Sequence, residues 1–182
     1  MQSAKYLVAA AALTLSPLVQ GFELTSSDIE AGKPMPKAQE YQGFGCDGGN
    51  ISPQLAWKDI PEGTKSFAVT AYDPDAPTGS GWWHWLAYNI PASVHELASG
   101  AGNPASDLAP AGMVQHRTDY GSTGFGGACP PKGDKPHRYQ FKIFALDVDQ
   151  LDIDPASSAA LVGFMLNAHK IGVAELESLY QR

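Results

Sequence analysis

The sequence predicts a mainly β protein in which helical structure is confined to the C-terminal part of the chain. Clusters of Gly, Pro, Asn and Asp recur at short intervals along the whole chain, as is typical of short strands joined by tight loops. Between these clusters lie three runs that are rich in aromatic and β-branched residues and alternate in part between apolar and polar positions. We predict strands over these runs, at 66–72, 83–90 and 138–146.

Helical spacing appears after the last of these runs. Apolar residues at positions 160, 161, 164, 165 and 168 recur with the period of an α-helix, which predicts a helix over 157–170. A second short helical stretch is predicted over 173–180. Short helices near the C-terminus therefore complete the predicted fold.

Length and charge limit the classes of protein that the chain can represent. With 182 residues, of which 43% are hydrophobic, the chain can bury the core of one domain, which we assign to 22–182. The balance of 12 Lys+Arg against 19 Asp+Glu gives a net charge of −7. Because a protein that binds nucleic acid usually needs a basic face, we expect no nucleic acid partner.

The segment 1–21 has the composition of a secretory signal peptide. A single basic residue, Lys5, precedes an apolar run over 6–15, and a small residue, Gly21, closes the segment. The run is shorter than the ~20 apolar residues that a membrane span needs, so no transmembrane segment is expected in the mature chain. We predict a periplasmic or secreted protein. The alternative is a buried N-terminal helix of a cytosolic protein, since only one lysine precedes the run.

Two cysteines, Cys46 and Cys129, are far apart in the sequence and do not have the spacing of a zinc site. In an oxidising compartment such a pair is typical of a disulfide, which would stabilise the fold by roughly 4 kcal/mol. The alternative is two unpaired buried thiols. The predicted signal peptide favours the disulfide.

Common catalytic motifs are absent from the sequence. The segment 43–48 matches G-x-G-x-x-G, but Ser52-Pro53 follows so soon that it cannot begin a phosphate-binding helix, and we predict a turn there. There is no G-x-S-x-G, Walker or H-E-x-x-H motif. The usual hydrolase, nucleotidase and zinc protease signatures therefore do not apply.

Two stretches combine residue types that packing alone does not require. The first, "YDPDAPTGSGWWHW" at 72–85, contains two carboxylates, one histidine and three tryptophans. The second, "GFGGACPPKGDKPHRYQF" at 124–141, places glycines and prolines beside His137. Acids, imidazoles and aromatic rings together predict a binding site.

The motifs D-P-D-A-P at 73–77, W-W-H at 82–84, P-P-K-G at 130–133 and H-R-Y at 137–139 resemble the phosphatidylethanolamine-binding protein family, also called the Raf kinase inhibitor protein family. With its signal-like N-terminus, the chain looks most like the secreted bacterial branch. The resemblance implies a large antiparallel sheet packed on a smaller sheet. It also implies a ligand pocket where the two motif loops converge, with Cys129 in place of a glycine that is common in animal members.

Carried over to this sequence, the resemblance implies a pocket formed by Asp73, Asp75, Trp82, His84, Pro131, His137 and Tyr139. Imidazole, tyrosine hydroxyl and backbone N–H groups are suitable donors for a phosphate or a carboxylate. Asp73 fits such a site if it accepts a hydrogen bond from a histidine or receives the amino group of a zwitterion. If imidazolium is the donor, the affinity for an anion should rise as the pH falls.

Other residues of these types are assigned structural roles. His95, His116 and His169 lie outside the motifs, and Trp83 and Trp85 are expected to serve packing. No cofactor and no metal are expected.

We therefore expect a secreted or periplasmic binding protein that holds a small anionic or phosphorylated ligand, such as phosphate or a phospholipid head group, in a preformed pocket. From the resemblance we also expect the protein to modulate a protein partner by means of its ligand. The sequence leaves both a monomer and a homodimer open. The alternative is a hydrolytic enzyme that uses the His/Asp pocket. No activated Ser or Cys nucleophile is visible in the sequence, which favours the binding protein.

Overall fold

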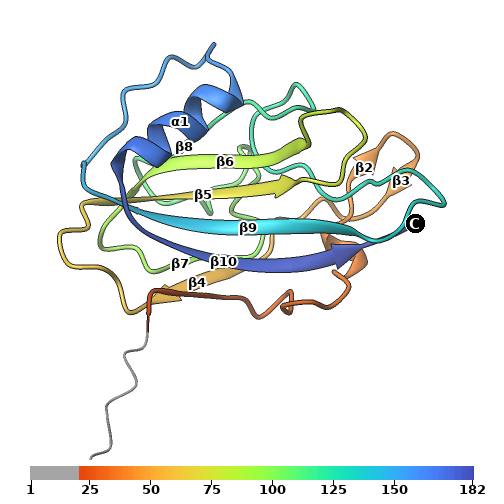
Figure 1. Ribbon diagram of the computed structural model, residues 1–182, viewed down its shortest axis with the longest axis horizontal. Helices are drawn as coiled ribbons and strands as arrows, with labels where there is room; N and C mark the ends of the chain where they lie inside the picture. The colour runs from red at the N-terminus through yellow and green to blue at the C-terminus, as the bar shows by residue number, and fades with distance from the viewer. Residues whose placement is uncertain (1–20) are drawn as a thin grey trace, which may run out of the picture.

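A five-stranded antiparallel sheet forms the centre of the computed structural model, which describes residues 21–182. Three of its strands correspond to the predicted runs, which confirms those predictions, and Figure 1 shows them side by side. In spatial order the strands are β10 (Lys170–Tyr180), β9 (His137–Leu146), β5 (Ser66–Asp73), β6 (Trp82–Pro91) and β8 (Val114–Gln115).

A smaller antiparallel sheet packs on one face of the large sheet. Its order is β1 (Glu23–Thr25), β4 (Leu55–Lys58) and β7 (Glu96–Leu97). A separate hairpin of β2 (Gln42–Gly43) and β3 (Cys46–Asp47) follows the short 3₁₀ helix Lys37–Gln39. This arrangement confirms the mainly β fold with a large and a small antiparallel sheet, and it places the predicted turn at 43–48 in a hairpin.

The hydrophobic core lies on both faces of the large sheet. Between the two sheets, Leu55 and Trp57 of β4 pack in one cluster with Phe67, Trp85 and Phe141 of the large sheet. A second cluster on the opposite face is covered by the C-terminal helix. Because both faces are covered, nearly every residue of β5 is buried, including the polar residues Ser66, Thr70 and Asp73.

The helix α1 (Ala159–His169) confirms the helix predicted over 157–170. Its first turn is capped by Ser158, whose hydroxyl accepts a hydrogen bond from the backbone N–H of Leu161. The helix packs through Val162 and Leu166, whereas Phe164 is 66% exposed. The apolar stripe noted in the sequence therefore does not coincide with the buried face of the helix.

The second predicted helix, over 173–180, is wrong. These residues belong to β10, which pairs with β9 along its whole length and forms an edge of the large sheet. Ala174, Leu176 and Ser178 are buried, while Glu175 and Glu177 between them point outward. This period of two is that of a strand, and the pairing of β10 with β9 satisfies the backbone hydrogen bonds of both strands. Pairing between strands therefore overrides the weak local helical signal.

The N-terminal prediction falls largely outside the described residues, because the signal segment covers 1–21 and the structure describes the chain from residue 21. Within the described part, no helix is long and apolar enough to cross a membrane.

Candidate functional site

A pocket of about 170 Å³ lies where β5 ends and where β6 and β9 begin. In Figure 1 this is the end of the large sheet near the β2–β3 hairpin and the C-terminus. Every predicted site residue except Asp75 lines it. The full lining consists of Phe44, Asp73, Ala76, Pro77, Thr78, Trp82, His84, Tyr120, Cys129, Pro130, Pro131, His137 and Tyr139.

Asp73 and His137 form a buried pair at the base of the pocket. They are the last residue of β5 and the first residue of β9, so the pairing of these neighbouring strands brings them together. The His137 Nδ1–H donates to Asp73 Oδ2 over 2.8 Å, and the backbone N–H of Asp75 donates to Asp73 Oδ1 over 2.8 Å. On its other side, His137 Nε2 lies 3.4 Å from Asp134 Oδ2.

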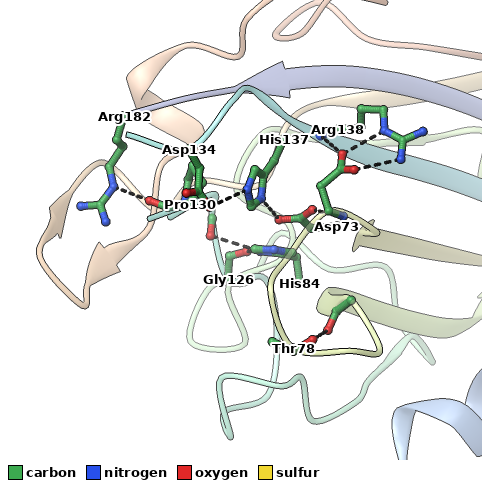
Figure 2. A network of polar contacts seen from close by, with 12 residues as sticks. Asp73, Thr78, His84, Gly126, Pro130, Asp134, His137, Arg138 and Arg182 are labelled. Atoms are coloured by element: carbon green, nitrogen blue, oxygen red, sulfur yellow. Dashed lines mark hydrogen bonds and ion pairs between the residues drawn. The ribbon is translucent and has the colours of Figure 1, made fainter. Parts of the chain in front are cut away.

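Figure 2 shows His137 between these two carboxylates. Asp73 thus accepts from a histidine N–H, which is one of the two arrangements that the sequence analysis considered. The hydrogen bond from His137 Nδ1 holds Asp73 in place, and the other ring nitrogen of His137 faces Asp134.

His84, on β6, has the opposite orientation from the one that an anion donor requires. Its Nδ1 lies 2.8 Å from the carbonyl oxygen of Gly126 and 3.2 Å from that of Gly127. Because carbonyl oxygens only accept hydrogen bonds, Nδ1 must carry the proton. Burial lowers the pKa of His84, so the ring is neutral at physiological pH and its Nε2 is an acceptor. The expectation that His84 donates to an anion is therefore corrected.

Two donors in the pocket lack a partner. The Tyr139 hydroxyl and the Trp82 Nε1–H are buried, and neither has a hydrogen bond of good geometry with another described residue, although the Asp73 carboxylate lies near the Tyr139 hydroxyl. Burial, and then the negative charge of Asp73, raise the pKa of Tyr139, so its hydroxyl keeps its proton and can donate. Since a buried donor without a partner costs about 1–3 kcal/mol, these groups fit a ligand that brings oxygen acceptors.

Asp75 has a structural role that differs from the predicted contact with ligand. Its carboxylate accepts from Arg138 Nε and Nη2 over 2.9 and 3.0 Å. The hydrogen bond from this guanidinium lowers the pKa of Asp75 to about 2. This ion pair anchors the loop after β5 on β9. Asp75 is not part of the pocket lining.

Two aromatic walls of the pocket were not predicted from the sequence. Tyr120 stacks on Tyr41 with ring centroids 4.0 Å apart and donates its hydroxyl to the carbonyl of Gly127. Phe44, at the tip of the β2–β3 hairpin, is 71% exposed and forms part of the rim. The positive φ of 51° at Phe44 is unusual for a residue other than glycine, but the sequence carries no signal for it.

Two cross-links hold the walls of the pocket together. Cys46 and Cys129 lie as a disulfide pair with their Cα atoms 6.0 Å apart, in agreement with the predicted pairing and the predicted tether on the second loop. The C-terminal residue, Arg182, donates from Nε to the carbonyl of Pro130 and from Nη1 to that of Gly45, each over 2.8 Å. The hairpin and the loop before β9 are thus joined by a covalent and a polar contact.

The groups in the pocket that bear on catalysis are few. Of the side chains that line it, Thr78 carries the aliphatic hydroxyl, and this group donates to the carbonyl of Gly81. Within residues 21–182, no group of three His, Cys, Asp or Glu side chains is placed to hold a metal ion.

These features define a two-sheet β protein with a small, preorganised ligand pocket at one end of its large sheet. The family model for phosphatidylethanolamine-binding protein matches residues 25–181. The chain therefore belongs to the phosphatidylethanolamine-binding protein family, and it is a ligand-binding protein of this kind.

Relatives in bacteria support the same assignment. The chain is 55% identical to the Escherichia coli protein YbcL over 169 residues, which are 93% of this chain and 92% of the relative. It is 48% identical to Escherichia coli YbhB, over 87% of this chain and 99% of the relative. The crystal structure of YbcL, described as a member of the mammalian PEBP family, superposes with a TM-score of 0.87 and covers 90% of this chain and 99% of that one.

Proposed function

We propose that this protein is a secreted binding protein that holds a small anionic, phosphorylated ligand in its pocket. The observation that carries the proposal is the pair of buried donors, Tyr139 Oη and Trp82 Nε1, which line the pocket without a partner. A phosphate oxygen would satisfy both groups, and the volume of about 170 Å³ suits a small group. The aromatic and prolyl walls around it make the surroundings of the donors less polar than water, which strengthens each hydrogen bond to the ligand.

The test of this function is the removal of one donor. The change Tyr139→Phe keeps the ring and removes the hydroxyl, so we expect it to weaken the binding of inorganic phosphate about 10- to 100-fold. Isothermal titration calorimetry measures the change. The matched control is Tyr88→Phe, because Tyr88 packs under α1 on the face of the sheet opposite to Tyr139. The Tyr88→Phe variant should bind phosphate with the affinity of the wild type. Wild-type affinity in a folded Tyr139→Phe variant would place the site elsewhere.

A hydrolase is the competing function. The Asp73–His137 pair resembles an acid–base dyad, but His137 Nε2 faces Asp134 and does not face a nucleophile. A panel of ester and phosphodiester substrates tests this alternative. Turnover that disappears in His84→Ala would support the enzyme and contradict the binding protein.

The proposal also includes a location outside the cytosol, for which the segment 1–21 and the cysteine pair are the support. We expect fractionation of the producing cell to place the mature protein in the periplasm or the medium. Alkylation of the denatured, unreduced protein should then modify neither Cys46 nor Cys129. Two modified thiols, or a full-length protein retained in the cytosol, would contradict this part of the proposal.

A further inference from the structure

A second hollow, the α1 groove, lies between α1 and the face of the large sheet that the small sheet does not cover. It has a volume of about 180 Å³ and shares no lining residue with the pocket at the end of the sheet. Thr70 of β5 and Lys142 and Phe144 of β9 line it from the sheet. Figure 1 shows α1 on the side of the sheet away from the β2–β3 hairpin. The α1 groove is therefore a site of its own.

The walls of the α1 groove are largely apolar. Trp83 of β6 and Tyr72 of β5 are cross-strand neighbours with ring centroids 4.5 Å apart. On α1, Gly163 leaves room beside the indole, since even an added Cβ would lie 3.9 Å from the ring of Trp83. Val173 of β10 lines the groove and is 41% exposed. Such walls suit an apolar group of about the size of one ring.

The charged side chains that line the α1 groove are all positive, although the whole chain carries −7. Lys142 and Lys170 line it, and within residues 21–182 no Asp or Glu does. Lys170 Nζ donates to Asn167 Oδ1 over 2.6 Å, which holds one ammonium where β10 begins. Lys142 Nζ lies 3.3 Å from Glu175 Oε2 of its cross-strand neighbour. The complementary ligand is an anion.

A buried hydroxyl in the α1 groove lacks a partner. Thr70 is only 2% exposed, and its hydroxyl has no hydrogen bond with another residue of the described chain. Thr70 and Lys142 are directly opposite each other in the pairing of β5 with β9, so both side chains lie on the same face of the sheet. These two adjacent donors match the two oxygens of a carboxylate. The further oxygens of a phosphate or sulfate would meet the apolar walls unpaired.

From these observations we propose that the α1 groove binds a small carboxylate that carries an aromatic ring. The ring would lie against Trp83 and Val173, and the carboxylate would accept from the Thr70 hydroxyl and the Lys142 ammonium. Lys170 adds a second positive charge to the groove. The inference goes beyond the proposed function, because it concerns a different site and a different class of ligand.

Phenylacetate is the probe, titrated by calorimetry in the presence of saturating inorganic phosphate. We expect a Kd on the order of 0.1–1 mM, as is reasonable for a ligand of this size. Phenylacetamide has the same shape but no charge, so it should bind at least about tenfold more weakly. Phosphate should not displace phenylacetate, whatever its own affinity for the other pocket.

Two variants remove one donor each and keep the size of the side chain. Thr70→Val and Lys142→Met should each weaken the binding of phenylacetate by about tenfold. Lys142→Met should also reduce the preference for phenylacetate over phenylacetamide, which a loss of packing alone would not do. The matched control is Lys58→Met, because Lys58 forms an ion pair with Glu23 in the small sheet. This variant should bind both probes as the wild type does.

A third variant is expected to bind more tightly, a result that misfolding cannot produce. Glu175→Gln releases Lys142 from its ion pair, so the affinity for phenylacetate should rise roughly two- to fivefold. Three results would overturn the inference: no binding of phenylacetate to the wild type, equal affinity for phenylacetate and phenylacetamide, or displacement of phenylacetate by phosphate. Each of them leaves the proposed function standing, because the proposed function depends on the pocket that contains Tyr139 and Trp82.

Discussion

The change His137→Ala is expected to lower the free energy of unfolding by about 3–5 kcal/mol at pH 7, because it leaves a buried charge without its partner. The side chains of Asp73 and His137 are only 4% and 2% exposed, so solvent cannot replace the lost hydrogen bond. Urea denaturation measures the change. The neighbouring variant Arg138→Ala is the control, because its guanidinium is about half exposed and such pairs contribute at most about 1 kcal/mol.

A double variant separates the lost charge pair from the lost packing. In Asp73→Ala with His137→Ala, neither a carboxylate nor an imidazole is left unpaired, so we expect the double variant to be more stable than His137→Ala alone. Both variants lose the base of the pocket, and both should bind phosphate more weakly than the wild type. A double variant that is as unstable as the sum of the two single variants would show that the pair is not energetically coupled.

The central strands of the large sheet could be predicted from the sequence. Both of their faces are buried, so their sequences are rich in aromatic and β-branched residues. The residues of β10 carry a weaker signal. Leu176 and Leu179 suit a helix as well as a strand, and only pairing with β9 decides between them. In α1 the helix itself could be predicted, but its buried face could not, since Val162 and Leu166 are no more apolar than Phe164.

The sequence predicts those residues of the site that belong to the two motif stretches, 72–85 and 124–141. Phe44 and Tyr120 come from other loops and reach the pocket through the fold, so no local pattern marks them. The direction of hydrogen bonds could not be predicted either. His84 was expected to donate, but the carbonyls of Gly126 and Gly127 occupy its protonated nitrogen. Asp75 matches a motif position, yet Arg138 takes up both of its oxygens.

Replacing both cysteines by serine is expected to lower the free energy of unfolding by about 4.5 kcal/mol, since the bond closes a loop over a sequence separation of 83 residues. The unfolded chain gains the conformational freedom that the cross-link removes. Urea denaturation of oxidised wild type, reduced wild type and the Cys46→Ser, Cys129→Ser variant measures the effect. Reduced wild type should match the variant, and oxidised wild type should be the more stable of the three.

The same variant should also bind phosphate more weakly, for a reason that is separate from global stability. Cys129 lines the pocket and Cys46 begins β3, which follows the hairpin tip that carries Phe44. Without the bond, the contacts from Arg182 to Gly45 and Pro130 are left to hold the two walls. Adding Arg182→Ala to the serine variant should therefore weaken phosphate binding further, whereas Arg182→Ala in the oxidised wild type should have little effect. Equal effects of Arg182→Ala in both backgrounds would mean that the two cross-links act on the walls independently.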